Sequence, residues 1–148
     1  MDPKQILKTV EKYYGAITAH ELPVRKPQIE PVQKGIKQVQ VKAPADSAQL
    51  AMAWKVPRLE PGKLDDPEPY ALELLTAVLD GYDNARLNRI LVKQEKVVND
   101  VGVGYDMVSR GPELFLISAS MAKGKTVPQA QASIRKALDE LKQKGILE

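Results

Sequence analysis

Residues 49–56 read Gln-Leu-Ala-Met-Ala-Trp-Lys-Val, and this stretch decides the class of fold. Leu50, Met52, Trp54 and Val56 are large and apolar, whereas the residues between them are small or polar. Alternation with a period of two is typical of a β-strand that buries one side only. We therefore expect a sheet with one apolar face, which needs a covering layer.

Further strands are expected on both sides of this stretch. Residues 36–42 alternate in the same way, and the polar residues 43–47 supply a turn into residue 49. The alternation returns over residues 97–105 and again over 114–121, with an Arg-Gly-Pro turn at 110–112 between them. The second pair is expected to form an antiparallel hairpin with a rather long loop.

Four segments carry apolar residues at helical spacing, three or four positions apart. The first covers residues 3–14, and the second begins at Pro67 and ends at Gly81. The third begins at Asp83 or Asn84 and continues through Leu91, and the fourth is capped by Thr126 and ends at Gly145. Because each strand offers one apolar side, the helices are expected on one face of the sheet. The predicted fold is α+β, a two-layer sandwich of an antiparallel sheet covered by helices on one face.

The composition excludes several classes of site. The 148 residues suffice for one core, so a single domain over residues 1–148 is expected. With no cysteine and a single histidine, His20, the chain cannot build a thiolate site or a two-histidine zinc site. The basic and acidic residues are interleaved and the chain has one Phe and one Trp, which argues against a nucleic-acid reader. No apolar run reaches the roughly 18 residues of a membrane span.

Two local patterns have ordinary structural explanations. Residues 123–126, Lys-Gly-Lys-Thr, follow a strand and precede a helix as a phosphate-binding loop would, but the position that requires the first glycine is Ala119. We expect Thr126 to be a helix cap, and nucleotide binding is a weak alternative. Asp65, Asp66 and Glu68 are interpreted as residues that favour a helix N-terminus and not as an acid/base pair.

Several stretches resemble the C-terminal-type domain of the insulinase/pitrilysin peptidases. They are residues 74–81 (Leu-Leu-Thr-Ala-Val-Leu-Asp-Gly), 85–92 (Ala-Arg-Leu-Asn-Arg-Ile-Leu-Val), 12–15 (Lys-Tyr-Tyr-Gly), 53–57 (Ala-Trp-Lys-Val-Pro), 103–106 (Val-Gly-Tyr-Asp) and 110–111 (Arg-Gly). No single one is diagnostic, but they keep a consistent order and spacing over residues 3–146.

The resemblance implies a parent protein with two lobes. In this family an N-terminal lobe binds zinc through an inverted H-x-x-E-H helix, and a glutamate polarises the zinc-bound water. This chain has no such motif, so no catalytic or metal-binding residue is expected in it, and the zinc and the peptide substrate belong to the parent. The expected partner is the N-terminal zinc-bearing lobe, and similar bacterial proteins suggest a periplasmic parent. Met1-Asp2 and the tag-like Leu147-Glu148 suggest an excised piece.

The resemblance also points to two positions on the wall of the substrate chamber. Family members that contact substrate through this domain use an arginine and a tyrosine, and the aligned positions here are Val92 and Asn99. The domain would then line the chamber without donating those hydrogen bonds. An alternative remains, because paired domains of this kind can lose the zinc and serve as non-enzymatic scaffold or assembly subunits. An upstream segment with or without H-x-x-E-H would separate the two.

Overall fold

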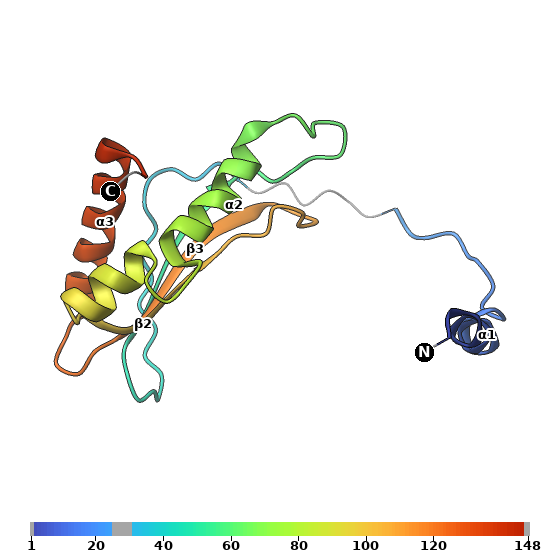
Figure 1. Cartoon of the computed structure of the whole chain (residues 1–148), viewed down its shortest axis with the longest axis horizontal. Coiled ribbons are helices and arrows are strands. Elements are labelled where there is room, and N and C mark those ends of the chain that lie inside the picture. The colour runs from blue at the N-terminus through green and yellow to red at the C-terminus, as the bar shows by residue number, and fades with distance from the viewer. Residues whose placement is uncertain (1, 25–30, 147–148) are drawn as a thin grey trace. The chain divides into compact units, whose positions relative to one another are not determined.

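A computed structural model describes residues 2–24 and 31–146 of the chain (Figure 1). The chain divides into two compact units, residues 1–35 and 36–148, which are described one at a time. The tag-like Leu147-Glu148 and Met1 lie outside the described residues, as do residues 25–30 of the proline-bearing segment that the sequence suggests is extended.

The first unit contains one helix, α1 (Pro3–Tyr14), with the predicted bounds. The carboxylate of Asp2 caps it by accepting a hydrogen bond of 3.0 Å from the amide of Lys4, and Pro3 occupies the first turn, where no amide donor is needed. The amide of Gly15 closes the last turn on the carbonyl of Glu11. The described residues of this unit have no buried side chain.

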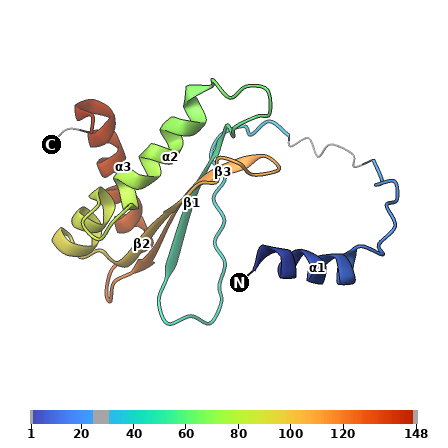
Figure 2. The ribbon, with the colours of Figure 1, turned by 45° about the vertical axis from the view of Figure 1, so that its right-hand side comes forward.

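The second unit is built on a three-stranded antiparallel sheet, seen in Figure 2. Its strands are β1 (Gln49–Val56), β2 (Val98–Gly104) and β3 (Glu113–Met121), in the spatial order β1-β3-β2. The pairing of β2 with β3 confirms the predicted hairpin. Ile117 in the central strand is paired with Met52 on one side and with Val103 on the other, which fixes the register.

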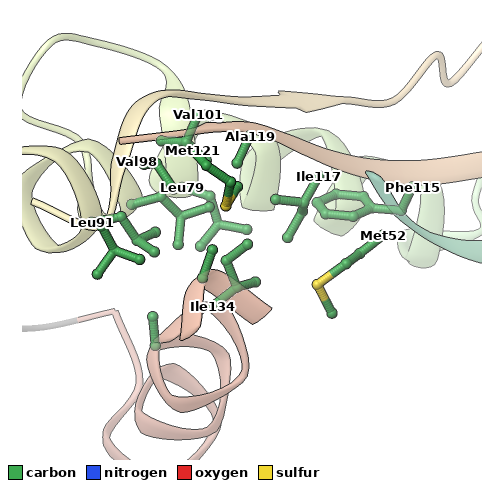
Figure 3. Close-up of a cluster of buried hydrophobic side chains, with 14 residues drawn as sticks. Met52, Leu79, Leu91, Val98, Val101, Phe115, Ile117, Ala119, Met121 and Ile134 are labelled. Carbon is green, nitrogen blue, oxygen red and sulfur yellow. The ribbon is translucent and has the colours of Figure 1, made fainter. Parts of the chain in front are cut away.

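Three helical segments complete this unit. They are α2 (Pro67–Asp80), the π-helix η1 (Asn88–Gln94) and α3 (Val127–Lys144). All three contribute side chains to the cluster that also holds the buried side chains of the sheet (Figure 3). The structure therefore confirms an α+β sandwich, with the helices on one face of the sheet. None of the helices in the described residues is long and apolar enough to span a membrane.

The core lies between that face and the helices. Its members are apolar side chains from all three strands, all three helical segments and the residues next to η1 and β2: Met52, Leu79, Leu87, Leu91, Val97, Val98, Val101, Phe115, Ile117, Ala119, Met121, Ala130, Ile134 and Ala137. β3 alternates strictly, since Phe115, Ile117, Ala119 and Met121 are buried while the side chains between them are not. β3 is paired with a strand on each side and is therefore the central strand of the sheet, and its buried side chains contribute to the core.

The predicted strand over residues 36–42 is wrong. These residues form no strand and are exposed throughout, with Val39 82% and Val41 80% accessible. The reason lies at the adjacent edge: Trp54 of β1 remains 38% exposed, so the helices do not extend far enough to cover another strand. Without apolar surface to bury, the alternation in this segment does not yield a fourth strand.

The outer edge of β1 is consequently open. The amide of Met121 donates to the carbonyl of Ala48, and antiparallel pairing then directs the amides of Ala51 and Ala53 away from β3. Within residues 2–24 and 31–146, β3 is the only strand paired with β1.

The third predicted helix forms, but with π geometry. The amide of Glu95 bonds to the carbonyl of Ile90, five residues back, at 2.8 Å, and that of Val97 bonds to Leu91 at 2.9 Å. Lys96 between them has a positive φ of 51°, a conformation that costs free energy for a residue with a Cβ. Only three residues, 95–97, lie between the end of η1 and the start of β2.

Removing a side chain from the central strand should destabilise the second unit much more on one face than on the other. Ile117→Ala leaves a cavity among the helices and is expected to lower the free energy of unfolding by about 2–5 kcal/mol. Leu116→Ala, on the neighbouring residue of the uncovered face, is expected to cost under about 1 kcal/mol. Urea denaturation measures both; equal losses would contradict the one-sided burial.

Candidate functional site

A carboxylate at the end of α2 joins three elements of the second unit. Asp80 Oδ1 accepts a hydrogen bond of 2.8 Å from Asn88 Nδ2 in η1, and Oδ2 accepts one of 3.1 Å from the amide of Val103 in β2. In an antiparallel sheet, successive residues direct their backbone groups alternately toward the neighbouring strand and away from it. Gly102 and Gly104 direct theirs toward β3, so the amide of Val103 between them points to the outer edge of the sheet. Asp80 thus closes that edge and positions η1 beside it.

The two positions expected on the chamber wall lie on the elements that Asp80 connects. Val92 in η1 is half-buried and packs against the core. Asn99 in β2 is exposed, and its Nδ2 donates a hydrogen bond of 3.0 Å to the carbonyl of Met121. That bond falls where the register between β2 and β3 shifts, between Val98 and Asp100. Both side chains therefore already have partners within the domain.

The face of the sheet away from the helices is not covered by a helix. We call it the open sheet face; its described residues are Gln49, Ala51, Ala53, Lys55, Asp100, Gly102, Gly104, Leu114, Leu116, Ser118 and Ser120. Leu116 in the middle is flanked by Ala53 and Gly104, so short side chains surround it. The short side chains let an extended polypeptide approach closely, and Asp100, opposite Ser120, adds a carboxylate at one end of this face.

A hollow lies at the end of the sheet where two loops meet. The amide of Leu59 donates to the carbonyl of Met107 at 2.9 Å and ties the β1–α2 loop to the β2–β3 loop. The hollow measures about 650 Å³ and is lined by Arg58, Leu59, Pro61, Gly62, Leu64, Val108, Ser109 and Arg110. Two guanidinium groups beside apolar side chains suit a ligand that has both an anionic and an apolar part.

Tyr105 contacts two other segments of the chain at the same end of the sheet. Its hydroxyl donates a hydrogen bond of 2.8 Å to the carbonyl of Pro57, and its ring lies 6.3 Å from that of Phe115. Burial, followed by the negative charge of Glu113, raises the pKa of Tyr105 above its ordinary value.

The Lys-Gly-Lys-Thr segment is a helix start. Gly124 takes a positive φ of 77°, and the amide of Lys125 bonds to the carbonyl of Ala122. The amide of Thr126 donates to Gln129 Oε1 at 2.9 Å, which is half of a capping box. These amides are used within the chain, in agreement with the interpretation of Thr126 as a cap. Likewise, Asp66 caps α2 by accepting from the amide of Glu68 at 3.0 Å.

The part of the chain that the structure describes contains no cluster of three His, Cys, Asp or Glu residues that could hold a metal ion. His20 lies in the first unit with an exposed side chain. The second unit presents two surface features, the open sheet face and the hollow.

Sequence reasoning missed Asp80 and the hollow. A signal for Asp80 was present, because a carboxylate in the last turn of a helix opposes the helix dipole and requires a compensating partner. The hollow had no such signal, since its residues are brought together by the bond between two loops.

Replacing Asp80 should loosen the outer edge of β2. Asp80→Ala removes both acceptors and is expected to lower the free energy of unfolding by about 1–3 kcal/mol, because the amide of Val103 and the side chain of Asn88 lose their partners. Hydrogen exchange followed by NMR should show faster exchange at Val103. Asp139→Ala on the exposed surface of α3 is the control, and equal effects would contradict the assigned role.

The hydroxyl of Tyr105 should make stability depend on alkaline pH. Its pKa is raised in the folded state, so above about pH 10 the unfolded chain loses the proton first and the free energy of unfolding falls as pH rises. Tyr105→Phe is expected to reduce that fall and to cost about 1 kcal/mol at neutral pH. Urea denaturation between about pH 8 and 11 measures it; identical pH profiles for both proteins would contradict the assignment.

Comparison with known proteins agrees with this architecture. The crystal structure of a protease from Helicobacter pylori superimposes with a TM-score of 0.80 at 18% identity, over 100% of this chain and 35% of that one. The chain thus spans about a third of that protease. No curated protein sequence matches it. The family model described as "Peptidase M16 inactive domain" matches residues 1–148, which confirms the predicted resemblance to insulinase-like peptidases. The chain therefore belongs to the peptidase M16 family, as its inactive domain.

Proposed function

We propose that this chain is the non-catalytic domain of a zinc-dependent metallopeptidase and forms one wall of the peptide-binding chamber, opposite a zinc-bearing N-terminal lobe. The family match, whose description calls the domain inactive, supports the non-catalytic role. The solved protease, of which this chain covers 35%, leaves room for a second lobe in the parent.

The observation that carries the proposal is the one-sided covering of the sheet. The helices bury one face, while the open sheet face presents Ala, Gly and Ser residues around Leu114 and Leu116. Leu114 and Leu116 are 46% and 38% exposed on this face, and exposed apolar side chains among short ones suit contact with another polypeptide. An unfolded peptide could lie along such a face and contact it mainly through its backbone, which suits a chamber that accepts many sequences.

Of the two positions expected on the chamber wall, Val92 packs against the core on the helix side of the sheet, away from the open sheet face, and the side chain of Asn99 is already bonded. Val92 has no donor, and the Nδ2 of Asn99 is held by the carbonyl of Met121. The positions that donate hydrogen bonds to substrate in some family members would here maintain the η1–β2 junction. Substrate polarisation and water activation would then come entirely from the zinc-bearing lobe, through an H-x-x-E-H helix.

Reconstitution tests the proposal. The chain alone, dialysed against metal-free buffer, is expected to retain no zinc by mass spectrometry and to leave a fluorogenic unstructured peptide intact. The zinc-bearing lobe encoded with this chain should cleave the peptide when the two are combined. Stoichiometric zinc held by the isolated chain would contradict the proposal, and a lobe without H-x-x-E-H would favour a non-enzymatic scaffold instead.

The proposed role of the open sheet face as the chamber wall can be tested by placing a large side chain on it. Ser118→Trp places a large side chain between Ala51 and Gly102 and is expected to lower kcat/KM of the combined peptidase for a long peptide by about tenfold, or about 1.4 kcal/mol. Arg135→Trp, on the exposed surface of α3, makes the same change of size away from the wall and should leave kcat/KM within about twofold. Equal kcat/KM for both variants would remove the open sheet face from the chamber.

A further inference from the structure

The helix α1 has one apolar side and one charged side. At 100° per residue, Ile6, Leu7, Val10, Tyr13 and Tyr14 fall within one arc of about 120°, which we call the α1 apolar face. Lys4, Lys8, Glu11 and Lys12 occupy the opposite arc, together with Gln5 and Thr9. Only one side of this helix is therefore suited to burial against another surface.

Nothing in the described part of its own unit covers the α1 apolar face. Leu7 is 59% exposed and both tyrosines are 67% exposed, and even Ile6 and Val10 are nearly half accessible. A helix of twelve residues is marginally stable in water when it stands alone, since helical stability in proteins comes mostly from packing of the apolar side. The amphipathic pattern and the cap at Asp2 thus point to a partner surface.

The comparisons favour a partner surface within the same parent protein. The family model includes residues 3–14, so α1 belongs to the sequence that the family shares and is not an appended tail. The solved protease also matches this chain over its full length, α1 included, and this chain covers only 35% of it. The rest of such a parent supplies a lobe that could cover the helix.

We propose that the α1 apolar face docks on the zinc-bearing N-terminal lobe, so that α1 is a structural part of that lobe although it lies in the sequence of the inactive domain. The inference rests on the proposed function and names the surface through which the two lobes are joined. The chain between α1 and the second unit would then run from one lobe to the other.

A membrane surface is the competing partner for a helix with three lysines on its polar side. The observations favour the protein lobe, because the family model includes residues 3–14 and the solved protease matches this chain over its full length, α1 included. Vesicle binding is therefore one outcome of the test below.

Hydrogen exchange in the full-length parent tests the docking. Amides of residues 3–14 are expected to exchange at least about a hundredfold more slowly in the parent than in this chain alone, because a packed helix opens rarely. Val10→Lys, which puts a charge in the α1 apolar face, should abolish that protection. Gln5→Lys adds the same charge on the polar side and should preserve it. If Val10→Lys prevents the parent from folding, the milder Ile6→Ala should still reduce the protection.

Each outcome bears on the proposal separately from peptidase function. Equal protection in Val10→Lys and Gln5→Lys, in a parent that holds zinc and cleaves peptide, would overturn the docking and leave the function intact. Protection lost only in Val10→Lys, in a parent without H-x-x-E-H, would support the docking and overturn the function. Dimerisation of this chain through α1 in sedimentation experiments, or its flotation with vesicles of phosphatidylglycerol, would also overturn the docking.

Discussion

The burial of one side of β3 is the constraint on which the second unit depends. Phe115, Ile117, Ala119 and Met121 point to the helices and are nearly inaccessible, and the strand is paired on both edges. A sheet that buries one face only has to leave the other to solvent or to a partner. The division of the domain into a packed side and an open sheet face follows from this alternation along nine residues.

Much of this arrangement could be predicted because it is encoded locally. The strict alternation in β1 and β3 and the caps at Asp2, Asp66 and Thr126 are properties of short stretches, and the structure contains the elements that they predict. Residues 36–42 show where prediction from a local pattern fails. Their alternation resembles that of β1, but whether a strand forms depends on how far the helices extend over the sheet, which no local pattern contains.

The candidate site was less predictable for the same reason. Val92 and Asn99 were reached only through resemblance, and their contacts depend on a π turn and on a shift of register. Asp80 acts across 23 residues of sequence, on the amide of Val103. The family model describes the domain as inactive, and the carboxylates of Asp66 and Asp80 serve a helix cap and a sheet edge.

The two edges of the sheet are treated differently. Asp80 occupies a backbone donor of β2, whereas the amides of Ala51 and Ala53 on the outer edge of β1 face away from the sheet. Backbone groups that face outward beside small side chains, as at Ala51 and Ala53, are a template for intermolecular strand pairing. Concentrated solutions of the separated domain would thus tend to aggregate through β1, with Lys55 at the end of the strand as the charge that opposes it.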